Sequence, residues 1–262
     1  MPTFSSFEEE NKKTTVEYDL TDKQSKGAFL SKVFGMMFLC LLITTVVAAG
    51  LGYGFLFLLN ATAQDGVYNS DLVMGMLVTL IVSAIALLIM SFVLPITFAR
   101  GKHNIIVPLM IYVVLMGILL SCFTWVFDPI ILVESFGVTA LIFGLMALLG
   151  HLSKGKVAGI GIVMLGLLIG AGLLALFNFL SILFSGVKDS NVTISWIVSF
   201  AIFAFLMLMT IWDVARISKI ADQGMNSGNN LIYYCAYILY SDFIAILIRV
   251  IYYLAIITGK RR

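Results

Sequence analysis

Two aspartates stand inside strongly apolar runs of this chain: Asp213 in IWDVARI and Asp242 in LYSDFIAIL. A carboxylate in the core of a bilayer is costly and is retained mostly where it binds ions or moves protons. If the two side chains meet in a medium of low dielectric constant, they cannot easily both be ionised, so they share a proton and titrate as a pair. The sequence therefore predicts a pH-sensing and ion-binding site at Asp213 and Asp242.

The doubly ionised pair is also a candidate metal site, although a weak one. Calcium takes roughly 6–8 oxygen ligands, and two carboxylates with a few carbonyls or waters would hold it loosely. Loose binding suits the passage of an ion better than its storage. We expect transient calcium at Asp213 and Asp242 and no other cofactor.

Each aspartate also has a structural alternative, which the sequence leaves open. Asp213 could pair with Arg216, three residues later on the same face of its helix. Asp242 could pair with Arg249, two turns further along. The same two arginines are possible modulators of the site, because each adds positive charge near a carboxylate.

Two other charged residues border this part of the chain. Arg100 follows the second apolar run, where it could hold the ionised aspartates as a latch or serve only as a positive charge at the cytosolic face. Glu134 begins the fourth apolar run, where a helix dipole favours an anion. We expect Glu134 to be a structural cap, with a modulating role as the alternative.

These residues must be positioned by a chain that is almost entirely apolar. Of its residues, 61% are hydrophobic and 11% are charged, whereas average soluble proteins are roughly 25% charged. The composition indicates an all-α polytopic membrane protein whose surroundings are the lipid bilayer, with no nucleic-acid partner. The three cysteines lie in apolar runs, which argues against a disulfide framework or a zinc site.

Seven apolar runs are long enough to cross a bilayer, which takes about 20 helical residues. Pro95 is expected to end or bend the second run, and Glu134 to interrupt the start of the fourth. We expect residues 1–26 to form a disordered cytosolic tail and residues 27–262 to form a seven-helix transmembrane domain. The runs cover approximately 33–59, 72–99, 105–127, 130–150, 157–184, 193–217 and 231–258.

The placement of lysine and arginine orients these runs. Cations gather in the N-terminal tail and in alternate loops, which predicts a cytosolic N-terminus. The basic end Gly259-Lys260-Arg261-Arg262 then falls outside, unless the last run is re-entrant. Both versions stay open, with seven spans preferred. We expect a cell (plasma) membrane, since no targeting or retention signal is present; an endoplasmic-reticulum or Golgi membrane is the alternative.

The two aspartates differ in expected depth. Asp213 lies near the cytosolic end of its run, while Asp242 lies about 12 residues into the last run, or roughly 18 Å. A late start or an unwound entry to the last helix would bring them together. The loop 218–230, which contains glycines and Asn229-Asn230, could provide that slack.

Four stretches of the chain resemble the Bax inhibitor-1 family, also called the transmembrane Bax-inhibitor-motif or lifeguard proteins, in its bacterial type. The last two are specific in combination: one is similar to the family's Tyr-Asp-x-x-x-Ile and the other to its Leu-Tyr-x-Asp-Phe-Ile-x-Leu. The stretches are ESFGVTALIF (134–143), FNFLS (177–181), IWDVARI (211–217) and LYSDFIAIL (239–247).

The resemblance implies a fold and a function. The fold is a bundle of seven transmembrane helices with helix 7 at its centre. The function is a pH-sensitive calcium leak, governed by the paired aspartates that match Asp213 and Asp242, with a latch arginine that falls by position on Arg100. The chain departs from the pattern where Trp212 replaces a tyrosine and Arg249 replaces a neutral polar residue.

Two other functions compete with the leak. One is a membrane regulator that binds a partner, such as a membrane protease or a cell-death factor, through residues 1–26. The other is an intramembrane aspartyl protease, which also uses two helix aspartates. That class has a Gly-x-Gly-Asp setting, whereas this chain has Tyr240-Ser241-Asp242, so we do not expect an enzyme.

Overall fold

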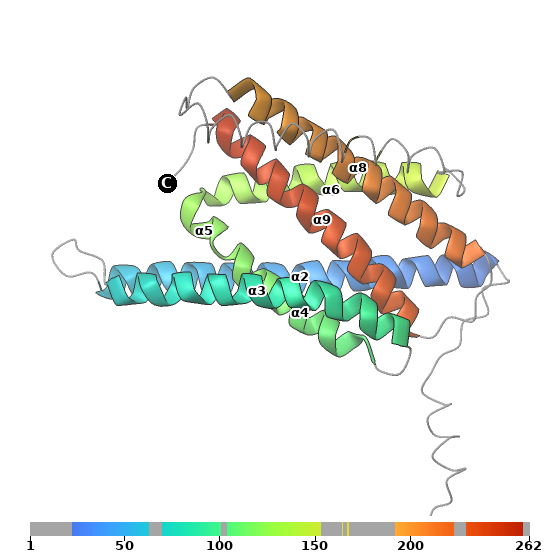
Figure 1. Ribbon diagram of the computed structural model, residues 1–262, viewed down its shortest axis with the longest axis horizontal. Coiled ribbons are helices and arrows are strands. Elements are labelled where there is room, and N and C mark those ends of the chain that lie inside the picture. The colour runs from blue at the N-terminus through green and yellow to red at the C-terminus, as the bar shows by residue number, and fades with distance from the viewer. Residues whose placement is uncertain are drawn as a thin grey trace, which may run out of the picture. The chain divides into compact units, whose positions relative to one another are not determined.

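The computed structural model describes residues 23–62, 70–100, 104–152, 164, 167, 192–222 and 229–258, which are helical apart from short connections (Figure 1). These residues contain six helices that are long and apolar enough to cross a membrane, one of them built from two segments. They are α2 (Lys23–Thr62), α3 (Ser70–Arg100), α4 with α5 (Ile106–Leu120 and Phe123–Val126), α6 (Pro129–Leu152), α8 (Val192–Asp222) and α9 (Asn229–Thr258).

The prediction of an all-α membrane-spanning architecture is confirmed by these helices. The expected fifth run, 157–184, lies outside the described residues apart from residues 164 and 167, and so does the FNFLS stretch. The count of seven spans therefore stays a prediction. The last run is one unbroken helix of 30 residues, about 45 Å long, which is the geometry of a crossing helix and not of a re-entrant loop.

Pro95 was expected to end or bend the second run. The helix α3 does not end there but continues through Pro95 to Arg100, because neighbouring groups can satisfy the backbone carbonyl that a proline leaves free in a membrane helix. A bend at Pro95 stays a prediction. Near the N-terminus, α2 begins at Lys23. Lys23 lies within residues 1–26, which were expected to form a disordered tail.

The expectation for Glu134 is also wrong. The helix α6 begins at Pro129, and its first turn contains no acidic residue. Proline fits the first helical position because its missing N–H group would have no partner there in any case. Glu134 is an exposed residue beyond that turn, so it neither interrupts the run nor caps the helix.

The described chain packs as two compact units, and α9 contributes residues to both. The first unit is Met1–Glu134, Ala221–Tyr240 and Leu254–Arg262, and the second is Ser135–Ile220 and Ser241–Tyr253. Within the first unit, α4 packs against α2 and α3. A glycine lets α2 come close to α5: the indole Nε1 of Trp125 donates to the carbonyl oxygen of Gly52 at 3.2 Å.

A buried polar contact joins α2 to the first part of α9. The hydroxyl groups of Thr44 and Tyr240 are 2.6 Å apart, and both side chains are almost fully buried. The ring of Tyr112 on α4 meets the ring of Tyr240 edge-on at 6.2 Å. This contact ties three helices of the first unit to one another.

Replacing that tyrosine by phenylalanine (Tyr240→Phe) is expected to destabilise the protein by about 1 kcal/mol, because it removes one partner of a buried hydrogen bond. The midpoint of thermal unfolding in detergent should fall by about 2–4 °C. Tyr252→Phe is the control, since Tyr252 is an exposed residue of the same helix and should unfold as the parent protein does. Equal midpoints for Tyr240→Phe and the control would contradict the prediction.

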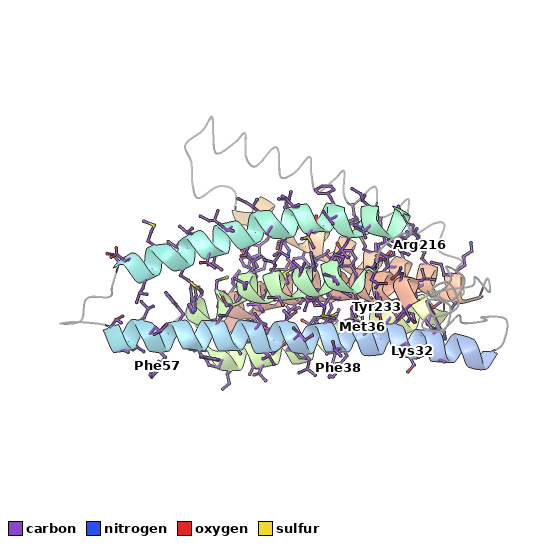
Figure 2. All side chains as sticks on the ribbon, turned by 90° about the horizontal axis from the view of Figure 1, so that it is seen from below. Lys32, Met36, Phe38, Phe57, Arg216 and Tyr233 are labelled. Atoms are coloured by element: carbon purple, nitrogen blue, oxygen red, sulfur yellow. The ribbon has the colours of Figure 1, made fainter. Side chains whose placement is uncertain are left out.

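Exposed apolar side chains cover the outer faces of the spans, as lipid contact requires. Phe38 and Phe57 on α2 are 61% and 73% exposed (Figure 2). The last span differs from the others: 61% of its most apolar stretch is buried, against 17–33% in the other five described spans. The most apolar stretch of α9 is therefore far more buried than that of any other described span, and α9 carries Asp242.

Candidate functional site

Both aspartates of the predicted pair lie in the second unit, Asp213 on α8 and Asp242 on α9. Their exposed fractions are only 5% and 8%. The helix α9 is unbroken from Asn229, so the expected unwound entry is wrong. The helix α8 instead continues to Asp222, which places Asp213 about nine residues, or roughly 14 Å, from the end of its helix.

The two carboxyl groups are within hydrogen-bonding reach of each other. A bond between them requires one carboxyl group to carry a proton and donate it, because two carboxylates have no donor. The second oxygen of each group, Oδ2, is buried and has no hydrogen-bond partner among the described residues. Each carboxyl group therefore keeps unused acceptor capacity, which a proton, a water molecule or a cation can take up.

Arg216 is the cation that acts on Asp213. It exerts an electrostatic effect on the Asp213 carboxyl group, yet the described residues contain no ion pair between the two side chains. Its guanidinium carbon lies 6.0 Å from the centre of the Trp212 ring, within the range of a cation–π interaction. Arg216 is exposed (Figure 2), so water screens its charge.

Arg249 lies two turns beyond Asp242 on α9 and is half-buried. Among the described residues it forms no ion pair with Asp242, so the structural alternative for that aspartate is not observed. The guanidinium of Arg249 is a positive charge seven residues, or roughly 10 Å, further along α9 than Asp242.

The helix α6 packs against α8 close to Asp213. A Cβ atom added at Gly150 would lie 2.7 Å from the carbonyl oxygen of Ile211 and 2.9 Å from the Cβ of Val214. Only glycine fits so short a distance between two helix backbones. The ring of His151, the next residue, also lies 3.3 Å from the hydroxyl of Ser218 on α8.

The same helix packs against α9 beside Asp242. The rings of Phe136 and Phe143 lie 5.4 Å and 5.5 Å from the ring of Phe243, the residue after Asp242. These distances are typical of favourable aromatic pairs. The helix α6 therefore covers both aspartate-bearing helices within the second unit.

The structure does not bring every expected residue to the pair. Arg100 is the last residue of α3, and its side chain lies outside the described part. Glu134 is exposed and belongs to the first unit. Thr139 was missed by the sequence reasoning: its hydroxyl group is fully buried and, among the described side chains, has no partner. The only sign of it in the sequence was that a polar threonine stands in the middle of the apolar run that forms α6.

The carboxyl pair by itself falls short of a complete calcium site. The described residues contain no group of three or more histidine, cysteine, aspartate and glutamate side chains that could hold a metal ion. Two carboxylates supply only part of the roughly 6–8 oxygens of a calcium shell. Further ligands would have to be hydroxyl groups, backbone carbonyls or water.

Comparisons with known proteins agree with the motifs around the two aspartates. A family model described as inhibitor of apoptosis-promoting Bax1 matches residues 26–259 of the 262-residue chain. A search of curated proteins gives no match. The matched range contains Asp213, Asp242 and the six described helices that are able to cross a membrane. The chain is a multi-pass membrane protein and belongs to the Bax inhibitor-1 family.

Proposed function

We propose that this protein is a pH-sensitive calcium leak of the cell membrane, gated by Asp213 and Asp242. The observation that carries the proposal is the buried carboxyl pair itself, with its two Oδ2 atoms that lack partners among the described residues. Membership of the Bax inhibitor-1 family supports a channel or regulatory role in a membrane. The pair supplies the chemistry by which such a role would respond to protons.

The pair works as a switch because its charge depends on the number of protons it holds. When both carboxyl groups are neutral, they attract neither a metal ion nor the cation of a latch. When the pair ionises, it attracts calcium, and the family resemblance offers Arg100 as a competing cation that closes the path. In this mechanism the closed form has an ionised pair and the open form a protonated one. A conformation that binds more protons is favoured as pH falls, so a low pH favours the open form.

The charged groups around the pair come from the helices packed on it. Arg216 on α8 is exposed, and Arg249 on α9 is half-buried. Both are positive charges and would therefore oppose the entry of calcium. On α6, Glu134 and His151 are exposed. The described residues of α6 therefore include no buried charged side chain.

The topology that we propose has seven spans, with the N-terminus in the cytosol and residues 157–184 as the fifth span. The basic residues of alternate loops support this orientation. The high buried share of α9 supports a central position for the last span. A central α9 would keep Asp242 away from lipid, as an ionisable side chain requires.

Calcium flux into liposomes that contain the purified protein tests the proposal. The flux should be faster at pH 6 than at pH 8, since the protonated pair favours the open form. Protein-free liposomes of the same lipid give the background at each pH. Flux that never exceeds this background, or that is equal at the two pH values, would contradict the proposed function.

A second candidate is a regulator that binds a protein partner, because the matching family description names the inhibition of an apoptosis-promoting protein. The two functions make opposite demands on the chain. A regulator that binds through the N-terminal segment should lose its cellular effect when residues 1–22 are deleted and keep it in Asp242→Asn. A leak should show the reverse.

A further inference from the structure

One tyrosine near the end of α9 fills a hole in the surface of α8. The ring of Tyr253 lies 6.2, 5.8 and 5.6 Å from three aromatic rings of α8, those of Trp196, Phe200 and Phe203. Its hydroxyl oxygen lies 2.9 Å from the hydroxyl oxygen of Ser199, which is almost fully buried. These four residues of α8 have the spacing i, i+3, i+4 and i+7, which forms the hole for one knob of a facing helix. Ring contacts and a hydrogen bond therefore both hold Tyr253 in place.

This contact and the aspartate pair lie along one seam between the same two helices. Ser199 precedes Asp213 by 14 residues on α8, and Asp242 precedes Tyr253 by 11 residues on α9. Both separations are close to a whole number of turns at about 3.6 residues per turn, so within each helix the two residues share a face. All four residues belong to the second unit. The two helices therefore run antiparallel and are joined at two points by polar side chains.

Neither helix has a hinge between the two contacts. The helix α8 is unbroken from Val192 to Asp222, and α9 is unbroken from Asn229 to Thr258. Neither contains a proline or a glycine, and sharp kinks usually have such a residue or a local bulge as their cause. A displacement of α9 at one contact is therefore passed along the helix to the other.

We propose that Tyr253 is a positioning residue for the aspartate pair: its ring, held in the hole of α8, sets the register of α9 against α8 and so the separation of the carboxyl groups of Asp213 and Asp242. This inference rests on the proposed function, in which that separation decides how the pair responds to protons. Two carboxyl groups share a proton only at hydrogen-bond distance. When a change of register separates them, each titrates by itself, and the response of the pair to pH becomes weaker.

The charges around the pair are the same in every variant of the test. Arg216 on α8 and Arg249 on α9 are retained, and the described residues of α6 include no buried charged side chain. The four α8 residues of the hole carry no charge either. A changed response to pH would therefore come from geometry and not from the loss of a charged neighbour.

The test is calcium flux at pH 6 and pH 8 by the full-length protein in liposomes. Tyr253→Leu removes the ring and the hydroxyl group, and it should reduce the ratio of the two rates about threefold or more. Tyr253→Phe keeps the ring in the hole and removes only the hydrogen bond, so its ratio should fall less. Adding Ser199→Ala to Tyr253→Phe should change nothing further, because the two side chains share that one bond.

An aromatic contact of the first unit separates positioning from a general loss of stability. Phe55→Leu removes a contact with Trp125, whose ring lies 4.6 Å away in the first unit. This variant should lower the midpoint of thermal unfolding and keep the ratio of the parent protein, whereas Tyr253→Leu should lower both.

Two results would overturn the inference and leave the leak intact. One is an unchanged ratio in Tyr253→Leu or, where that variant does not fold, in Tyr253→Phe. The other is an equal loss of the ratio in Phe55→Leu. A parent protein whose flux never exceeds that of protein-free liposomes would overturn the inference and the proposed function together.

Discussion

Asp242→Asn should abolish the pH dependence of calcium flux, so that the rates at pH 6 and pH 8 become equal. Asparagine has the shape of aspartate but does not titrate, and the partner carboxyl group then has no acidic proton to share. The parent protein should be faster at pH 6, because the open form holds more protons and is favoured as pH falls. Flux into liposomes at the two pH values measures the change.

Asp213→Asn should give the same loss, and the double variant should add nothing, because the two groups act as one titrating unit. Asp71→Asn is the control: Asp71 is an exposed residue in the first turn of α3, and this variant should keep the full pH dependence. Undiminished pH dependence in Asp242→Asn would remove the aspartate pair from the gating mechanism.

Gly150→Ala should destabilise the protein by about 1–3 kcal/mol. The added Cβ would lie 2.7 Å from the carbonyl oxygen of Ile211, a backbone atom that moves only with its helix. A shift of α8 also moves Asp213, two residues away, relative to Asp242. We therefore expect a lower midpoint of thermal unfolding together with a weaker pH dependence of flux.

Gly144→Ala is the matched control for this prediction. Gly144 lies on the same helix, but a Cβ there meets nothing within 4 Å. Alanine should stabilise the helix at that position by about 0.5–1 kcal/mol, because it restricts the unfolded chain. If both variants unfold at the same temperature, the close contact between α6 and α8 does not contribute to stability.

Several spans could be predicted closely from apolar runs alone. The second run, expected at 72–99, is observed at Ser70–Arg100, and the last, expected at 231–258, is observed at Asn229–Thr258. The errors lie where polar residues continue a helix beyond its apolar part, as at Lys23 in α2 and Asp222 in α8. An apolar run marks the part of a helix that contacts lipid, and a helix continues while its backbone bonds can form.

The candidate site was predictable in its residues and less so in its geometry. Asp213 and Asp242 stood out because charge is rare in a membrane helix. The way in which they approach each other depends on where α8 ends. The last residues of α8 lie beyond the apolar run, so hydrophobicity alone could not locate that end. Thr139 was hidden for a different reason: sequence shows that a threonine is present, but its rotamer and its neighbours decide whether its hydroxyl finds a partner.

The tryptophan beside the pair makes the site visible to spectroscopy without a label. Indole emission shifts with the electric field at the ring, and Trp212 lies next to Asp213 with the guanidinium of Arg216 6.0 Å from its centre. The chain has only two other tryptophans, Trp125 and Trp196, which a variant with phenylalanine at both positions removes. The remaining indole would then report each change of charge at the aspartates in its emission spectrum, in real time and in a native bilayer.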